Sequence, residues 1–502
     1  MKRLLVLLLA LALLIPSAAL GLGDHYENWY EIFVYSYQDS NGDGIGDLRG
    51  LQSRLDYVQE MGYTGIWLMP VMPSPSYHKY DVTDYYGIDS QYGTLQDFHA
   101  LVEDCHQRGI KLIIDMPINH SSSQHPLFLE ACNALKNGRT DDTAVDFYCF
   151  SQKGGQKMTA VENSEWFYEE QFTGGGMPDL NLDSEQVRAE IRKIFDFWLN
   201  DVGVDGFRLD AVTSYYAADT QRNVAFLAWL KQMTEEVKPG AYLVGEAWTG
   251  LTTIAEYYQS GLDSFFLFPA SQAEGPVAKS ILARSKPANP YLNAIAQYQE
   301  ALGDVIWAPF LGNHDTGRAV GSLQARQAPQ RAKFAEGLLN MMGGATFTYY
   351  GEEIGMVGSG DDPNKRLAMY WNDSDMTQQP PGVTKLEYAY PCVDDQLADE
   401  NSLLNYCKKL NHLKLQVPAI ARGRNETLHN DGTVAVMKRE WMGERCWIVI
   451  NFSGKTAQEY ELAQGGLSLA GVLDATAEKT LVTVLEGKVH MTLAPYGIAV
   501  FE

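Results

Sequence analysis

Short apolar runs alternate with longer amphipathic stretches along most of the chain. Eight runs have the length of a buried β-strand, and the stretches between them carry apolar residues at helical spacing. The predicted strands cover residues 32–37, 65–70, 112–117, 206–211, 241–246, 264–268, 305–311 and 346–350, and the predicted helices include 48–61, 95–108, 186–200, 222–237 and 331–342. Because eight repeats of strand and helix close a parallel barrel, the pattern predicts an α/β protein with a (β/α)8 TIM barrel.

Two segments break this alternation. Residues 121–177 are rich in Gly, Asn, Asp and Ser and follow the third predicted strand, where an inserted subdomain would protrude over the barrel mouth. From about residue 416 short alternating runs replace the helical period, which predicts an antiparallel β-sandwich. We therefore expect a barrel formed by residues 22–120 and 178–415, an inserted B subdomain at 121–177, and a C-terminal β domain at 416–502.

The first residues have the order of a secretory signal. Lys2 and Arg3 precede an apolar run over residues 4–15, and Pro16 and small residues follow it. An uncleaved membrane anchor is the alternative, but the run is shorter than the roughly 20 residues that span a bilayer. We expect residues 1–21 to be a signal peptide and the mature protein to be secreted, extracellular and free of the membrane.

Composition and charge narrow the class of ligand. The chain is 45% apolar and 20% charged, as in packed globular proteins, and its net charge of -24 argues against nucleic acid and anionic membranes as partners. A neutral ligand is unaffected by that net charge. We also expect the protein to be a monomer. The six cysteines contain no CxxC pair, so they could form disulfides after export or remain buried thiols.

Four predicted strands end in polar residues. In a parallel barrel the active site forms at the carboxyl ends of the strands. A single carboxylate there is more often a helix cap or a surface group, but four such strand ends are hard to dismiss. The segments are Asp115 to His120, Arg208 to Asp210, Gly245 to Glu246, and Asn313 to Asp315.

A pair of carboxyl groups on neighbouring strands fits glycoside hydrolysis. One carboxylate attacks the anomeric carbon while a second, kept protonated, donates to the departing oxygen. Asp210 and Glu246 end adjacent predicted strands, which suits the separation of about 5 to 5.5 Å that retention of configuration requires. Arg208 lies on the same strand face as Asp210, so its charge would keep that carboxylate ionised.

Four sequence blocks carry a family resemblance. DMPINH at 115–120, GFRLDAV at 206–212, GEAW at 245–248 and GNHD at 312–315 resemble, in order and spacing, the motifs of the α-amylase family, glycoside hydrolase family 13. The resemblance implies Asp210 as nucleophile, Glu246 as general acid/base and Asp315 as the third acid. It also implies that Tyr80 is a stacking platform, that His120 and His314 bind hydroxyls of the same glucose unit, and that Arg208 orients Asp210. We further predict that Asp81 and Tyr85, which lie close to Tyr80 in the sequence, contact the substrate.

The segment from Asp39 to Asp47 places oxygen-bearing residues at alternate positions around glycines, as a calcium loop does. Gly50 stands where an EF-hand has its bidentate Glu, so a solvated turn is the alternative. The loop resembles the calcium loop of the oligo-1,6-glucosidase branch of the family, which implies a structural Ca2+ held by Asp39, Asn41, Asp43, Ile45 and Asp47. Asn119 resembles a ligand of a different calcium site, without identifiable partners.

Details of the motifs bear on the bond that is cleaved. MPDLN at 177–181 resembles a group intermediate between oligo-1,6-glucosidases and neopullulanases, and Ala211 resembles α-1,4-acting members. Ser214 and Tyr215 depart from the Lys-His of many α-amylases. We predict a retaining hydrolase that cleaves α-1,4 bonds in starch, related glucans or maltooligosaccharides. The alternatives are an exo-acting α-glucosidase or oligo-1,6-glucosidase, a neopullulanase-like transglycosylase, and a non-catalytic carbohydrate-binding barrel.

Overall fold

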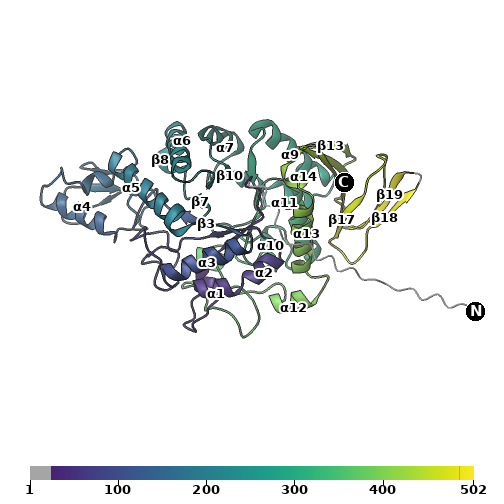
Figure 1. The fold of residues 1–502 in the computed structure, drawn as a ribbon, viewed down its shortest axis with the longest axis horizontal. Coiled ribbons are helices and arrows are strands. Elements are labelled where there is room, and N and C mark those ends of the chain that lie inside the picture. The colour runs from purple at the N-terminus through teal and green to yellow at the C-terminus, as the bar shows by residue number, and fades with distance from the viewer. Residues whose placement is uncertain (1–23, 486) are drawn as a thin grey trace, which may run out of the picture.

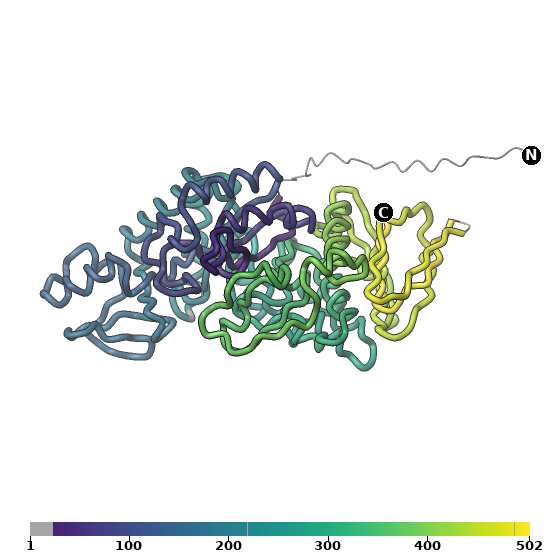
Figure 2. Tube along the Cα trace, turned by 90° about the horizontal axis from the view of Figure 1, so that it is seen from below, coloured from purple at the N-terminus to yellow at the C-terminus, as the bar shows by residue number. Residues whose placement is uncertain are grey.

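The computed structural model describes residues 24–485 and 487–502, so the predicted signal peptide at 1–21 lies outside the described residues. The chain forms three parts along one long axis. The barrel lies between the inserted subdomain, which contains α4 (Pro126–Lys136), and the C-terminal strands, and both views place these two parts at opposite ends (Figures 1 and 2). Within the described residues, no helix combines the length and apolar character needed to cross a membrane.

Eight parallel strands form the central sheet, in the order β11-β10-β9-β7-β3-β2-β1-β12. A parallel bridge between Phe310 and Phe347 joins the two end strands, so the sheet closes on itself and the predicted barrel is confirmed. The strands are β1 (Trp29–Ile32), β2 (Gly65–Leu68), β3 (Lys111–Met116), β7 (Gly206–Leu209), β9 (Tyr242–Gly245), β10 (Ser264–Phe266), β11 (Ile306–Ala308) and β12 (Phe347–Tyr349).

Aromatic side chains fill the barrel interior. The Trp29 ring stacks on Tyr242 with centroids 5.2 Å apart and on Phe347 at 5.7 Å. Gly65 lies where a Cβ atom would come within 2.4 Å of the Trp29 ring, so no larger residue fits there without a shift. The interior is therefore a packed core, and a ligand must bind at an end of the barrel.

The first predicted strand is displaced in the structure. Residues 32–37 were expected to be extended, but β1 ends at Ile32 and a 3-10 turn, η1 (Val34–Ser36), follows. There the chain bends back toward the next loop, and Gly46 donates to the Tyr35 carbonyl at 2.8 Å. A buried turn and a buried strand give the same apolar run, so hydrophobicity alone could not separate them.

Helices surround the barrel and fill the connections between strands. They are α1 (Leu48–Ser53), α2 (Leu55–Glu60), α3 (Leu95–Gln107), α5 (Glu185–Asp196), α6 (Thr220–Val237), α7 (Leu251–Tyr257), α8 (Pro276–Leu282), α9 (Ala288–Leu302), α10 (Ala319–Ser322), α11 (Pro329–Met342), α12 (Val393–Ala398), α13 (Leu403–Gln416) and α14 (Ala419–Arg422). The helix predicted over 48–61 divides at Arg54, whose Nε donates to Gln38 at 2.7 Å. Helix α5 continues as a π-helical turn, η3 (Phe197–Val202).

The inserted subdomain has a small core of its own. Helix α4 and η2 (Val145–Phe147) pack against a three-stranded sheet of order β4-β6-β5, formed by Phe150–Ser151, Phe167–Glu169 and Met158–Ala160. Phe128, Tyr148 and Tyr168 lie at the centre of its apolar cluster. The subdomain follows β3, as the sequence predicted.

The C-terminal part consists of two antiparallel sheets that share an apolar core, which confirms the predicted β domain. The domain was predicted to begin at residue 416, but its first strand begins at Arg424. The helices α13 and α14 occupy most of the residues from 403 to 422. The five-stranded sheet contains β13 (Arg424–Asn430), β14 (Val434–Trp441), β15 (Glu444–Asn451), β20 (Gly497–Phe501) and β17 (Leu469–Asp474), and the three-stranded sheet contains β16 (Gln458–Leu462), β19 (Lys488–Leu493) and β18 (Leu481–Leu485).

The six cysteines are unpaired. Cys105, Cys392, Cys407 and Cys446 are buried, and Cys132 and Cys149 are partly buried in the inserted subdomain. Of the two interpretations that the sequence left open, the structure has free thiols.

Candidate active site

Three acidic residues from separate strand ends line one cavity of about 470 Å³. Asp210 follows β7, Glu246 follows β9, and Asp315 lies in the loop after β11. These strands enter the barrel from the same end, so their carboxyl ends meet on one side. The structure thus brings together the three acids that the sequence singled out.

One guanidinium group joins most of the acidic side chains. Arg208 is fully buried, and its Nη1 atom lies 2.7 Å from an oxygen of Asp210 and 2.7 Å from an oxygen of Asp115. Its Nη2 atom lies 3.1 Å from Glu246 Oε2. These carboxylates outweigh burial and raise the pKa of Arg208, so a fixed positive charge lies between the acids.

Burial changes the proton affinity of two of these acids. It raises the pKa of Glu246 to about 7, although the charge of Arg208 opposes the shift. In the same way, burial raises the pKa of Asp115 to about 7 against Arg208. Glu246 reaches the cavity, whereas Asp115 is completely buried beneath it. Glu246 therefore retains much of its proton near neutral pH at the edge of the cavity.

The chain turns sharply after Asp210. Ala211 has a φ of 48°, in the left-handed region that residues with a side chain rarely adopt. Its backbone N–H donates to Glu246 Oε2 at 2.9 Å. The unusual backbone thus ties the segment that carries one acid to the side chain of the other, which is a common use of local strain at functional sites.

Asp315 lies among cations. It contacts His314 Nε2 at 3.0 Å and Arg366 Nη2 at 2.7 Å. Burial raises the pKa of the carboxyl group, but His314 and Arg366 outweigh it and hold that pKa well below its usual range. Burial in turn lowers the pKa of His314, but Asp315 and Glu31, whose oxygen lies 2.5 Å from His314 Nδ1, raise it to about 10. Asp315 is thus an anion paired with an imidazolium.

Tyr80 connects these groups across the floor of the cavity. Its hydroxyl donates to Asp115 Oδ2 at 3.0 Å and lies 2.6 Å from His314 Nε2. Its ring stacks on the His314 ring at 5.6 Å with an angle of 18°. The stack and the two polar contacts fix the ring as part of the cavity wall.

His120 lies at the junction of the barrel and the inserted subdomain. It lines the cavity, it pairs with Asp179 in a single β-bridge, and its buried Nε2 atom finds no hydrogen-bond partner among the described residues. Asn119, for which the sequence gave no partner, donates from Nδ2 to Asp179 Oδ1 at 3.0 Å. Burial raises the pKa of Asp179 to about 7.

Of the predicted substrate-binding residues, Tyr80 and His120 line the cavity, and the others are not among its lining residues: Asp81, Tyr85, Arg208 and His314. Asp81 accepts hydrogen bonds from the hydroxyls of Ser74, at 2.6 Å, and Ser76. The Tyr85 hydroxyl donates to the main-chain carbonyls of Pro117, at 3.0 Å, and His120, at 2.7 Å. The Tyr85 hydroxyl thus holds the loop that carries His120, whereas both contacts of Asp81 use its Oδ1 atom. Their contact with substrate stays a prediction.

The cavity wall also contains side chains beyond the predicted catalytic and substrate-binding set, from loops far apart in the sequence: His78, Phe172, Met177, Thr213, Ser214, Trp248, Asp362 and Arg366. Trp248 is 51% exposed, and its ring stacks on Phe268 at 4.8 Å. The sequence could have identified Trp248, because it lies two residues after Glu246 in the same motif. It could also have identified Phe172, which lies close to a run of glycines at 174–176. Arg366 had no such signal.

The loop from Asp39 to Asp47 is wound into successive turns in which side-chain oxygens accept backbone N–H groups. Asp39 accepts from Gly42 at 2.7 Å and Asp43 accepts from Ile45 at 2.7 Å. Asp47 accepts from Gly50 at 2.8 Å and thereby caps α1. Among the described residues, no three His, Cys, Asp or Glu side chains gather closely enough to hold a metal by themselves.

The barrel and its inserted subdomain match a known protein family. A family model described as "Alpha amylase, catalytic domain" matches residues 31–423. Alpha-amylase 3 of Dictyoglomus thermophilum is 35% identical over 445 residues, covering 85% of each protein. An oligo-1,6-glucosidase of Parageobacillus thermoglucosidasius is 30% identical over 513 residues, covering 85% of this chain and 90% of the relative.

Two solved structures match nearly the whole chain. Eubacterium rectale Amy13B has a TM-score of 0.89 and 40% sequence identity, covering 95% of this chain and 96% of its own. An alpha-amylase from H.orenii has a TM-score of 0.83 and 34% identity, covering 95% and 99%. The likeness therefore extends beyond the barrel into the C-terminal β domain.

Proposed function

This chain belongs to the α-amylase family of glycoside hydrolases, and we propose that it cleaves α-1,4-glucosidic bonds in starch, related glucans or maltooligosaccharides with retention of configuration. In this proposal Asp210 is the nucleophile, Glu246 is the general acid/base and Asp315 stabilises the distorted sugar. The same cavity would hold one glucose ring of the chain at the point of cleavage.

The Arg208 fork supports this proposal best. Because Asp210 and Glu246 contact the two Nη atoms of one guanidinium group, their carboxyl groups are held side by side. That arrangement suits the roughly 5 to 5.5 Å of a retaining pair better than the roughly 6.5 to 9.5 Å of an inverting pair, which must leave room for water. Their environments also differ, since Glu246 has a raised pKa and lies where it can donate a proton.

The first half of the reaction forms a covalent intermediate. The Asp210 carboxylate attacks the anomeric carbon, the bond from that carbon to the glycosidic oxygen breaks, and the oxygen takes the proton of Glu246. Positive charge develops on the sugar ring in the transition state, so the anionic Asp315 would stabilise it electrostatically. The Arg208 guanidinium, 2.7 Å from Asp210, orients its carboxylate for the attack.

The second half returns the enzyme to its starting state. Glu246, now ionised, removes a proton from water as the water oxygen attacks the anomeric carbon and Asp210 departs. The Ala211 N–H and Arg208 both contact Glu246 Oε2, so they stabilise the carboxylate that forms between the two steps. Tyr80, His120 and His314 would bind the hydroxyls and face of the same glucose ring.

The preference for α-1,4 bonds rests on likeness. The D. thermophilum relative and the H.orenii structure are both called alpha-amylases, whereas the oligo-1,6-glucosidase relative is less similar, at 30% identity. Ala211, next to the nucleophile, agrees with α-1,4 action. Exo-acting α-glucosidase, oligo-1,6-glucosidase and transglycosylase activities are the alternatives that an experiment must separate.

We further propose that the enzyme is secreted, on the signal-like order of residues 1–21, and that it acts as a monomer. We also propose a structural Ca2+ in the loop from Asp39 to Asp47. The loop offers oxygen ligands from Asp39, Asn41 and Asp43, the kind that Ca2+ prefers. Since too few carboxylates gather there, the Asn41 amide and the Ile45 carbonyl would have to complete the set.

Product analysis on three substrates tests the proposed specificity. Purified enzyme is incubated with amylose, pullulan and isomaltose, and products are separated by size while the anomeric form is followed by NMR. We expect a mixture of α-configured maltooligosaccharides from amylose and no cleavage of isomaltose. Glucose as the only early product would point to exo action, cleavage of isomaltose would assign α-1,6 activity, and β-configured products would exclude the retaining mechanism.

A further inference from the structure

A second cavity, of about 320 Å³, lies at the opposite end of the barrel from the three acids. Val305 and Gly344 line it just before β11 and β12 begin, whereas the acids follow strand ends on the other side. Its other wall is formed by the end of α14, the end of β14 and Met442, which directly follows β14. The cavity therefore lies between the barrel and the C-terminal domain.

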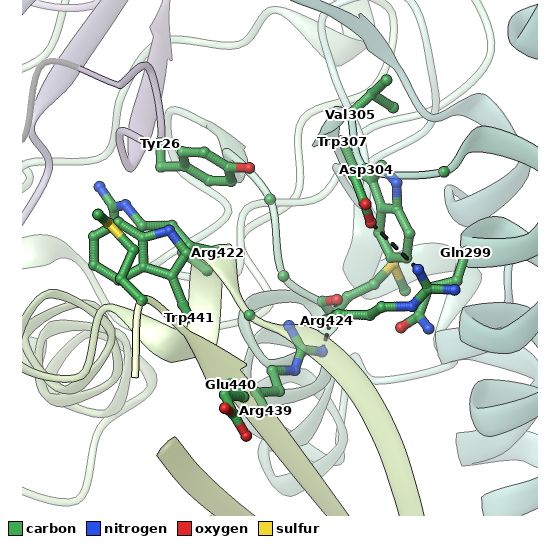
Figure 3. A pocket seen from close by; sticks show the side chains of 17 residues that line it. Tyr26, Gln299, Asp304, Val305, Trp307, Arg422, Arg424, Arg439, Glu440 and Trp441 are labelled. Atoms are coloured by element: carbon green, nitrogen blue, oxygen red, sulfur yellow. Dashed lines mark hydrogen bonds and ion pairs between the residues drawn. The ribbon is translucent and has the colours of Figure 1, made fainter. Parts of the chain in front are cut away.

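Aromatic rings from three separate segments line this second cavity. Tyr26 precedes β1, Trp307 belongs to β11 and Trp441 ends β14. The Arg422 guanidinium lies 4.9 Å from the Tyr26 ring and 5.4 Å from the Trp441 ring, and Asp24 holds it at 2.5 and 2.7 Å. Figure 3 shows these rings and the arginine around the same space. Arg422 thus holds the Tyr26 and Trp441 rings in place on this wall, although the residues are far apart in the sequence.

The remaining wall offers both donors and acceptors. Arg424 and Asp304 face each other with only a 3.5 Å contact, and their side chains are 68% and 85% exposed. An exposed ion pair of this kind contributes little to stability, so both groups are free to bind something else. Gln299 and Glu440 also line the cavity, but Gln299 is hydrogen-bonded to the main chain of Asn425 and Glu440 is paired with Arg445. Arg424 and Asp304 are therefore the polar groups that are most available to a ligand.

This combination of groups selects the ligand chemistry. Guanidinium and carboxylate groups can each bind neighbouring hydroxyls, and aromatic side chains contact the apolar faces of a ring. Three arginines also line the cavity, but Arg422 is paired with Asp24 and Arg439 is bound to main-chain carbonyls. A small anion would therefore meet only Arg424, beside the repelling carboxylates of Asp304 and Glu440. A polyhydroxylated ring satisfies acceptors, donors and aromatic side chains together.

We propose that this cavity is a second glucan-binding site that holds the polymer away from the catalytic centre. The proposal rests on the proposed function only for the identity of the sugar. Binding there keeps a long α-glucan attached to the enzyme after each cleavage. Short substrates that fill only the catalytic cavity gain nothing from it.

Isothermal titration with maltoheptaose tests the site in the inactive Asp210→Asn protein. We expect two binding events, and Trp441→Ala added to that protein should weaken one of them roughly tenfold, as loss of one aromatic anchor does. Arg424→Ala, whose side chain is 68% exposed and whose loss cannot disturb the core, should weaken the same event about threefold. Leu481→Ala, on an exposed strand of the same domain, is the matched control and should change neither event.

Activity measurements separate this proposal from the proposed function. In the active enzyme, Trp441→Ala and Arg424→Ala should lower the initial rate on granular starch severalfold and leave kcat/KM on a chromogenic maltotrioside unchanged. A single binding event, or two events that neither substitution alters, would overturn the second site. Failure to hydrolyse any glucan, with the Trp441-dependent event intact, would instead overturn the proposed function alone. Displacement of the ligand by inorganic phosphate at this event would show an anion site and reject the glucan assignment.

Discussion

Burial and charge act in opposite directions on the carboxyl groups that Arg208 joins. Burial favours the neutral form of Glu246, and the guanidinium favours its anion, so the balance leaves the pKa at about 7. Asp315, which is close to two cations, has its pKa displaced the other way. Single side chains of the same chemical type thus acquire different roles from their neighbours, as acid/base pairs in enzymes require.

The raised pKa of Glu246 predicts the alkaline limb of activity. The acid must be protonated to donate to the leaving oxygen, so kcat/KM on maltooligosaccharides should fall as pH rises through about 7. Above that point the fall should approach roughly tenfold per pH unit, because only the protonated fraction reacts. A pH profile of initial rates measures this. The control is an aryl glucoside whose leaving group needs no proton, and its rate should depend much less on pH in this range. A loss of kcat/KM on maltooligosaccharides that is already complete at pH 5 would contradict the prediction.

Removal of each acid should have a distinct kinetic effect. Asp210→Asn removes the nucleophile, so activity on every substrate should fall by about 10³-fold or more. Glu246→Gln removes proton donation, which typically contributes about 10²- to 10⁴-fold, and the loss should be smaller on substrates with good leaving groups. Steady-state rates on maltotriose and an activated aryl glycoside distinguish the two. Equal losses on both substrates in the Glu246 variant would argue against its role as acid, and circular dichroism verifies that both variants are folded.

At the scale of the elements, the loop between η1 and α1, where we propose a Ca2+ ion, contacts segments of the barrel. Its last residue, Asp47, caps α1, and Gly46 donates to the carbonyl of Tyr35 directly after β1. Gln378 donates to the Gly44 carbonyl at 2.7 Å, so a distant segment also depends on the shape of this loop. Any ion that stabilises the loop therefore stabilises the contacts around it.

Chelation tests that proposal. Treatment with EDTA should lower the Tm by about 5 °C, the size expected when a ligand that binds only the folded state is lost, and added Ca2+ should restore it. Asp39→Ala should abolish the dependence on Ca2+. This variant also loses turn hydrogen bonds, so the informative readout is the response to Ca2+, not the Tm itself. Asp141→Ala, on the exposed part of the inserted subdomain, is the control and should keep the full change of Tm with Ca2+. An identical Tm with and without chelator in the unaltered protein would reject the proposed ion.

The predicted elements show where sequence patterns were informative. The eight strand positions overlap the observed strands because their apolar runs are short, buried and bounded by polar residues. The first of them was displaced because η1 is equally buried, and the helix over 48–61 was predicted without its break at Arg54. Neither change alters the local apolar pattern, so both depend on partners elsewhere, such as Gly46 and Gln38.

At the scale of the whole molecule, one buried arginine joins the barrel to the C-terminal domain. Arg439, on β14, donates to the carbonyls of Met341, at 2.7 Å, and Met342, at 2.9 Å, and to that of Ile420. It thereby satisfies the C-terminal ends of α11 and α14. Gly343 leaves room for it, since a Cβ atom there would lie 2.3 Å from Arg439 Nη1.

Loss of this arginine should destabilise the protein as a unit. Arg439→Ala leaves three buried carbonyls without a donor, so the free energy of unfolding should fall by about 3 to 5 kcal/mol. Urea unfolding followed by tryptophan fluorescence measures the change. Arg445→Ala, an exposed residue on the next strand, is the matched control and should cost no more than about 0.5 kcal/mol. Similar unfolding midpoints for the two variants would show that the junction does not depend on Arg439.

The sequence by itself determined the barrel, the inserted subdomain, the C-terminal β domain and the convergence of Asp210, Glu246 and Asp315. Strand periodicity and the position of a residue at a strand end are local properties, and parallel closure brings all such ends together. Only the tertiary structure decided which side chains reach the cavity. It left Asp81, Tyr85 and His314 out of the cavity lining and brought Arg366 and Trp248 into it.

The second cavity shows the same limit. Tyr26, Trp307 and Trp441 belong to segments more than a hundred residues apart, and nothing in their local sequence relates them. The raised pKa of Glu246 likewise depends on its burial and on the position of Arg208, which no spacing along the chain specifies. Local patterns fix which residues a strand presents, whereas packing between distant segments fixes burial, charge environment and the shape of a site.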